Sequence, residues 1–214
     1  MGRFASIVVL SFIFINSVYS QGMYLSKEYG LSAGFLYGGG SEYNKIGFSA
    51  AFTLYGLLDF QYNHSKFKDD NSNNSFQNEY FIRAYLLKGK PYFFSAAVGY
   101  VTHNTEIELW RGFPLKLTNK GLALEAGLHL TSSNKEKNPK IISSIYYRYY
   151  NPEEVMNFPN GRTKEMKQVR SIMFELAVVF YYSKFCFVIG PRFSVENNFK
   201  DRFYGVNLSV NFKH

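Results

Sequence analysis

The sequence predicts an all-β fold, namely a closed antiparallel up-and-down transmembrane β-barrel of about ten strands, with eight strands as the alternative. Three observations lead to this fold class. Apolar residues alternate with small or polar residues in ten separate runs, and a period of two is that of a β-strand. The connections between the runs are alternately long and short. The first 20 residues are typical of a secreted protein.

Composition limits the other classes. The 214 residues suffice for one domain, and 22 Phe and 18 Tyr bring the aromatic fraction to 19%, which excludes a globally disordered chain. A single cysteine, Cys186, excludes a disulfide framework and a multi-cysteine zinc site. The net charge is +8, but the basic residues are scattered, so they do not form the stripe that binds nucleic acid.

The N-terminal segment predicts the compartment. Arg3 precedes an apolar run from Phe4 to Ile15, and Val18 and Ser20 occupy the −3 and −1 positions of a cleavage site. The run is shorter than the roughly 20 residues of a transmembrane helix. We therefore expect a signal peptide at 1–20 and a single barrel domain at 21–214, with an uncleaved anchor as the alternative.

The first five runs each carry bulky apolar residues on one face. Leu31, Ala33 and Phe35 alternate with Ser32 and Gly34, and the later runs repeat this arrangement. Each run is short enough to be a single strand. The predicted strands lie at 29–38, 46–54, 58–63, 80–86 and 92–100.

The second five runs follow the same rule. In the sixth run Leu122, Leu124 and Leu128 alternate with Glu125 and Gly127. The ninth run is less regular, because Pro191 interrupts it. These strands are predicted at 122–131, 141–149, 172–182, 185–192 and 204–212.

The connections indicate two different ends of the barrel. Long polar segments at 66–79, 103–119 and 151–168 alternate with tight links at 55–56, 88–91 and 183–184. Transmembrane barrels have long extracellular loops and short periplasmic turns. An even number of strands returns both chain ends to the periplasm, which ten strands satisfy.

The two faces of the strands favour lipid over water around the barrel. The bulky face alternates with a face rich in Gly, Ser, Ala and Asn, which is too small and too poor in Lys and Glu for a water-facing surface. Tyr92 and Tyr100 bracket a segment that spans roughly 19 Å when tilted, close to the apolar band of such barrels. The alternative is a secreted soluble β-barrel or sandwich.

The closing run carries a resemblance to a known group. The signal segment, the alternating repeat and the run from Tyr204 to Phe212 resemble the small outer-membrane β-barrel proteins of Gram-negative bacteria. This resemblance implies location in the outer membrane, with membrane lipid and the barrel-assembly machinery as partners. Gly205, Leu208, Val210 and Phe212 resemble the C-terminal signal that this machinery reads, although Lys213 and His214 follow Phe212.

Polar residues within the strands are the candidates for a specific site. Alternation directs them into a lumen only slightly wider than one that side chains fill, so buried charges there must pair. We predict a polar plug, with a pore constriction or anion-favouring ligand site as the alternative. The predicted lumen network comprises Arg83, Glu125, His129, Arg148, Glu175 and Arg192, and Asp59 is a further candidate.

The role expected from this pattern is non-enzymatic, either structural or in surface interactions. Loops on rigid scaffolds carry function, and the aromatic residues of the long segments are candidate contacts. These contacts are Phe76, Trp110, Phe113 and Phe158. No metal-binding, nucleotide-binding or nucleophile-elbow motif is present in the sequence, so no metal or other cofactor is expected.

Two other functions stay open on the sequence alone. The first is a narrow passive pore for small solutes. The second is a hydrolase at the barrel rim, either a protease that uses His64 or His103 with Asp69 and Asp70, or a lipid-modifying enzyme that pairs His129 with Ser132 or Ser133.

Overall fold

The computed structural model describes residues 29–40, 43–69, 74–86, 91–109, 113–133, 138–158, 161–197 and 201–213. The predicted signal peptide lies outside these ranges. No helix in the described ranges is long and apolar enough to cross a membrane. The strands are β1 (Gly30–Gly40), β2 (Tyr43–Leu54), β3 (Leu58–Asp69), β4 (Asn74–Leu86), β5 (Tyr92–Leu109), β6 (Phe113–Thr131), β7 (Lys140–Phe158), β8 (Gly161–Met166), β9 (Val169–Tyr182), β10 (Phe185–Glu196) and β11 (Asp201–Lys213).

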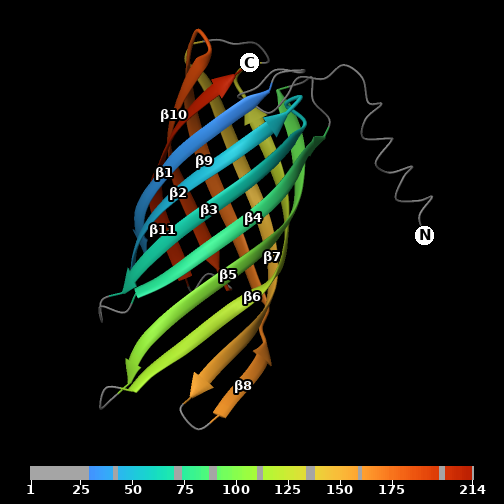
Figure 1. Cartoon of the computed structure of the whole chain (residues 1–214). Coiled ribbons are helices and arrows are strands. Elements are labelled where there is room, and N and C mark those ends of the chain that lie inside the picture. The colour runs from blue at the N-terminus through green and yellow to red at the C-terminus, as the bar shows by residue number, and fades with distance from the viewer. Residues whose placement is uncertain are drawn as a thin grey trace, which may run out of the picture.

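Ten of these strands form a closed antiparallel barrel (Figure 1). Neighbours in the chain are neighbours in the wall from β1 to β7, and β9, β10 and β11 complete the circuit. Closure is made by β1 and β11, which pair from Gly30–Lys213 to Gly40–Phe203. The predicted ten-stranded up-and-down barrel is therefore confirmed.

The eleventh strand, β8, lies outside the circuit. It pairs with the end of β7, from Glu153–Met166 to Phe158–Gly161, whereas the earlier part of β7 pairs with β9. The hairpin of β7 and β8 thus continues the wall beyond the closed part of the barrel. Figure 1 shows this hairpin and the β5–β6 hairpin reaching well past the ends of β10 and β11.

The three segments expected as long loops are largely strand. β5 and β6 stay paired up to Leu109 and Phe113, β3 extends to Asp69, and β4 begins at Asn74. In the extensions of β5 and β6 the face that is bulky within the barrel becomes polar, as Thr102, Asn104, Thr118 and Lys120 show. The alternation on which the strand prediction rests therefore does not continue in phase there.

The exterior of the barrel is apolar. Phe185, Phe187 and Ile189 of β10 are exposed, whereas Cys186 and Val188 between them are buried. Leu122 and Leu124 of β6 keep 66% and 57% of their surface exposed. Such a surface is unfavourable in water and suits lipid, where a closed barrel leaves no unpaired strand edge. The bulky face therefore points outward, opposite to a soluble barrel.

Tight turns mark one end of the barrel. Tyr55 and Gly56, in the link between β2 and β3, have φ values of 50° and 59°, and Ser183 between β9 and β10 has a φ of 53°. Positive φ values suit the short hairpin turns that match strand twist. The start of β1 and the end of β11 lie at this same end (Figure 1). We call it the turn end and the opposite end the outer end; in membrane barrels these face the periplasm and the cell exterior.

Gly190 lies where the pairing of β10 with β9 is interrupted. Pairing of β10 with β9 passes from Ile189–Val178 to Arg192–Glu175, so Gly190 and Pro191 lie outside the regular ladder on this side. A Cβ atom at Gly190 would collide with the carbonyl group of Leu176. Pro191 has no N–H group to donate, so it is tolerated where the ladder is interrupted.

Candidate functional site in the barrel lumen

Four charged side chains form a connected network inside the barrel. Arg148 of β7 places Nη1 2.7 Å from Oε1 of Glu79 on β4 and Nη2 2.9 Å from Oε2 of Glu125 on β6. Arg83 of β4 completes the network through an ion pair with the other oxygen of Glu125. The network therefore links three strands of the wall.

Burial makes these ion pairs mutually dependent. Glu125 is 4% exposed, and Arg83 and Glu79 are also buried. Removing one member of a buried pair leaves the other as an uncompensated charge, which is strongly unfavourable. Two aromatic rings also support the cations, because Arg148 lies 4.8 Å from the ring centre of Phe81 and Arg83 lies 4.9 Å from that of Tyr146.

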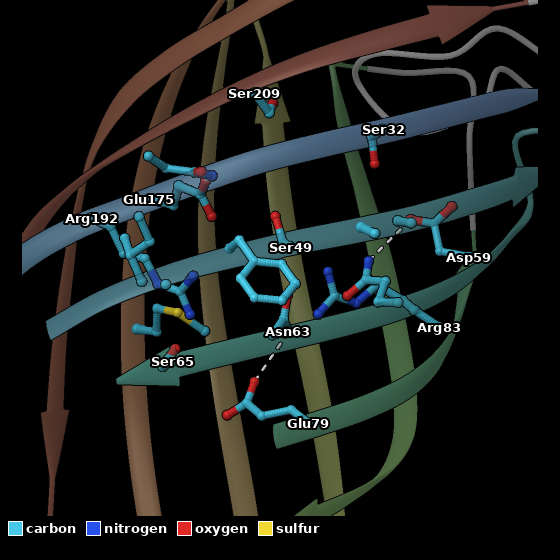
Figure 2. Close-up of a pocket in the computed structure, with 18 of the residues that line it drawn as sticks. Ser32, Ser49, Asp59, Asn63, Ser65, Glu79, Arg83, Glu175, Arg192 and Ser209 are labelled. Carbon is cyan, nitrogen blue, oxygen red and sulfur yellow. Dashed lines mark hydrogen bonds between the residues drawn. The ribbon is translucent and has the colours of Figure 1, made fainter. Parts of the chain in front are cut away.

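Glu79 has further donors besides Arg148. Gln77 donates from Nε2 to Oε1 at 2.9 Å, and Asn63 donates from Nδ2 to Oε2 at 3.1 Å. Figure 2 shows the bond between Asn63 and Glu79 beneath Arg83. Both carboxylate oxygens of Glu79 are thus occupied by neighbouring donors.

Asp59 forms a second polar group nearer the turn end. Its carboxylate accepts hydrogen bonds from the hydroxyls of Thr53 at 2.7 Å and Tyr85 at 2.8 Å, and from Nε2 of Gln61 at 3.2 Å. Neutral donors therefore hold this buried carboxylate, and it supports the wall between β2, β3 and β4.

His129 lies deep in the lumen and is 3% exposed. Its Nδ1 is 2.9 Å from the hydroxyl of Ser144 and its Nε2 is 2.9 Å from that of Ser95. The ring of Phe93 stacks on it with centroids 4.5 Å apart. The serines that these bonds join to His129 are on β5 and β7, whereas Ser132 bonds the backbone of Ile141 and Ser133 bonds Thr131.

Glu175 and Arg192 face each other across β9 and β10 but do not form an ion pair. Glu175 accepts a hydrogen bond from Asn207 at 2.9 Å. Within the described ranges, Arg192 has no carboxylate within 4.0 Å. Figure 2 shows both side chains beside the cavity, across the lumen from Arg83 and Asp59.

The lumen holds cavities in sequence along the axis. One of about 200 Å³ lies toward the turn end and one of about 390 Å³ toward the outer end. A smaller cavity of about 90 Å³ adjoins His129. The two larger cavities meet at one level of the lumen, where the same side chains line both cavities. These are Lys45, Glu79, Arg148, Met173 and Arg192.

The lumen network predicted from the sequence lacks two residues of this level, Lys45 and Glu79. Both fall just outside the predicted strands, which begin at Ile46 and Tyr80. Counting the alternation one residue further back would have placed both side chains inward, because Ile46 and Tyr80 face outward.

Of the four aromatic residues expected to make surface contacts, the structure describes the side chain of Phe76. Phe76 lies on the outside of the wall, where it stacks with His64 and with the ammonium group of Lys66. Trp110 and the side chains of Phe113 and Phe158 lie outside the described part of the structure.

The histidines near the rim lie on opposite faces of the wall. His64 faces outward and bonds Asn78 through Nδ1 at 2.8 Å, whereas His103 lines the outer cavity and stacks on Phe67. The side chains of Asp69 and Asp70 are not described. Among the described residues, no group of three or more His, Cys, Asp and Glu side chains could hold a metal ion.

The hairpin of β7 and β8 has its own ion pairs. Lys164 lies 2.5 Å from Glu153, and Lys167 lies 2.5 Å from Glu154. The hydrogen bond from Lys164 lowers the pKa of Glu153 below its usual value. Every residue of β8 is exposed.

Comparisons with known proteins identify the fold. No known family model matches the chain, and no curated protein matches it in sequence. Among solved structures, the translocator domain of the autotransporter NalP from Neisseria meningitidis aligns over 99% of this chain and 94% of that one, at 9% identity and a TM-score of 0.52. The beta domain of the Bordetella autotransporter BrkA aligns over 88% and 100%, at 5% identity and a TM-score of 0.55.

A third similar structure is an enzyme. The outer-membrane protease OmpT from Escherichia coli aligns over 88% of this chain and 94% of that one, at 7% identity and a TM-score of 0.46. This similarity is too low to support an argument about activity. With the apolar exterior, the comparisons show that the chain has the fold of an outer-membrane β-barrel.

Proposed function

We propose that this protein is a non-enzymatic outer-membrane barrel whose outer hairpins form a surface for contact with a partner. The observation that carries the proposal is the sheet of β5, β6, β7 and β8, which continues beyond the closed part of the barrel. A paired and ion-bridged sheet is a more rigid presenting surface than open loops.

The lumen supports a scaffolding role for the rest of the chain. Arg83, Glu79, Glu125 and Arg148 bind one another, and Asp59 binds neutral donors. His129 is enclosed by Ser95, Ser144 and Phe93. A hydrolase needs a nucleophile and base that a substrate can reach. The enclosed position of His129 favours a structural role for it.

Cross-linking from β8 tests the contact surface. A photoreactive residue in place of Thr163, which is exposed on β8, is expected to yield a discrete cross-linked species on intact cells. The matched control carries the same group in place of Tyr92, which is exposed near the turn end. Equal products from both positions, or none from Thr163, would contradict the proposal.

A narrow pore is a second candidate, because the two larger cavities meet at a shared level of side chains. Planar-bilayer recording of the purified barrel separates the two functions. We expect no steady current if the network of Arg83, Glu125, Arg148 and Glu79 blocks the lumen. A steady current that grows when Arg148 is replaced by Ala would favour the pore.

We also propose export through the signal peptide at 1–20 and insertion by the barrel-assembly machinery. Leu208, Val210 and Phe212 of β11 point outward in the last strand, which supports recognition of this strand during insertion. Mass spectrometry of the membrane-extracted protein tests the cleavage, since the mature chain is expected to begin at Gln21.

A further inference from the structure

Two cations at the level between the larger cavities form no ion pair with a described carboxylate. Within the described ranges, neither Lys45 nor Arg192 has a carboxylate within 4.0 Å. Both line the two cavities, so both border open space. A cation removed from water needs a compensating anion or donor environment.

The acids nearby are already engaged. Glu79 accepts from Arg148, Gln77 and Asn63, and Glu175 accepts from Asn207. Glu125 is shared by Arg83 and Arg148. Glu196 also lines the outer cavity. It is exposed to solvent at the end of β10 and makes a further interaction. Lys45 and Arg192 are therefore outside these ion pairs. Glu175 and Asp59 offset their charge over the lumen as a whole, but Lys45, Arg148, Lys167 and Arg192 outnumber Glu79 and Glu196 among the residues that line the outer cavity.

The register places these cations on one row of the barrel. Lys45 pairs with Gly38, Gly38 pairs with Gly205, and Gly205 pairs with Arg192. Three strand spacings separate the Cα atoms of Lys45 and Arg192 by roughly 14 Å along the wall, a gap that two long side chains and a small ligand can bridge. The two positions between them are glycines, and the ring of Phe203 lies over both, so a ligand in this row would lie on that ring.

Aromatic rings pack against the residues of this row. Phe203 lies against both glycines, because a Cβ atom at Gly38 or Gly205 would be 2.6 or 2.5 Å from its ring. The ammonium group of Lys45 lies 4.7 Å from the ring centre of Phe67 and 5.5 Å from that of Phe203. This contact holds the Lys45 charge in place without neutralising it.

We propose that the outer cavity binds a small oxyanion, of the phosphate or carboxylate class, between Lys45 and Arg192. The cavity of about 390 Å³ is within the range of small-ligand sites. Ser171, Ser194 and Gln77 also line it and supply neutral donors beside the two charges. The site is independent of the hairpin surface, so it stands or falls separately from the proposed function.

Calorimetric titration of the refolded barrel in detergent tests the site. Inorganic phosphate and acetate are the two probes, so the experiment also separates phosphate from carboxylate ligands. We expect saturable binding of at least one probe, weakened at least tenfold by Lys45→Gln and by Arg192→Gln. Lys45→Arg and Arg192→Lys, which keep the charges, are expected to retain binding.

Lys66→Gln is the matched control. It removes the same charge at the same level, since Lys66 pairs with Ile46, but its side chain lies on the outside of the wall over Phe76. Its binding is expected to equal that of the unaltered protein. The proposal is overturned if neither probe binds the unaltered protein, or if Lys66→Gln weakens binding as much as the two lumen variants do. Circular dichroism on each variant confirms that the barrel has formed.

Discussion

Arg148 on β7 binds Glu79 on β4 with 2.7 Å between Nη1 and Oε1, although the two residues are three strands apart in the wall. The contact crosses the lumen and does not follow the sheet. Its partner Glu125 ties the same guanidinium group to β6. The barrel is therefore braced from inside as well as by its backbone hydrogen bonds.

Replacing Arg148 by Met should remove this brace. Glu79 and Glu125 would each lose a partner, and breaking a buried pair in this way costs about 3–5 kcal/mol. Denaturant unfolding of the barrel in detergent measures the loss. Arg170→Met, at an exposed position on β9, is the control and should stay within about 0.5 kcal/mol. Equal stability of the two variants would show that the network contributes nothing.

Replacing Gly190 by Ala should hinder assembly of the barrel. The new methyl group would meet the backbone of Leu176, which cannot turn away as a side chain can. Overpacking of this kind costs about 1–3 kcal/mol. The yield of refolded protein and its thermal unfolding are the measurements. Gly161→Ala is the control, because nothing lies within 4 Å of a Cβ atom there. Wild-type behaviour of both variants would contradict the packing argument.

Replacing His129 by Leu should destabilise the turn half of the lumen. The hydroxyls of Ser95 and Ser144 would lose a shared partner, at a cost of about 1–3 kcal/mol. The test is again unfolding in detergent, with His64→Leu on the outer face as the control. If His129→Leu were as stable as the unaltered protein, the two hydrogen bonds would not matter for stability.

Cysteine labelling should report the membrane boundary. With a membrane-impermeant maleimide on cells, Thr163→Cys on β8 should react, whereas Val98→Cys within the apolar band should not. Cys186 is fully buried and should stay unmodified in the folded barrel, which supplies an internal reference. Labelling of Val98→Cys as fast as Thr163→Cys would rule out lipid around that face.

The ion pair between Glu153 and Lys164 should persist into acid. Because the pKa of Glu153 is lowered, the pair is present above the usual glutamate range and is lost as the pH falls through the lowered value. Side-chain NMR of the hairpin checks this by following the Glu153 carboxyl carbon. Its titration midpoint should return to the usual glutamate value in Lys164→Gln. A midpoint that is unaltered by this substitution would contradict the assigned cause.

The lipid-spanning part of the fold could be predicted from the sequence because its two faces differ. Between Tyr92 and Tyr100 each residue is either bulky and outward or small and inward, and the structure confirms that alternation. In the extensions of β5 and β6 the face that was bulky becomes polar, so this alternation does not continue in phase. The segment of β8, Gly161–Met166, is exposed on both faces, so no period of two appears in it.

The candidate site was accessible to sequence reasoning only in part. Alternation could direct Arg83, Glu125 and Arg148 inward, but it could not show which strands lie opposite each other. The bond between Arg148 and Glu79 depends on barrel closure and strand register. The row from Lys45 to Arg192 likewise depends on the pairing of β1 with β11, whose residues are far apart in the chain.

The position of β8 outside the circuit gives the barrel a one-sided rim. β5, β6 and the β7–β8 hairpin continue past the level at which β10 and β11 end (Figure 1). A large molecule that approaches from the side of the tall sheet meets a wall, whereas one that approaches over β10 and β11 meets the mouth of the lumen directly. A large molecule therefore reaches the interior more easily over β10 and β11. A partner bound to the sheet of β5 to β8 leaves that route open.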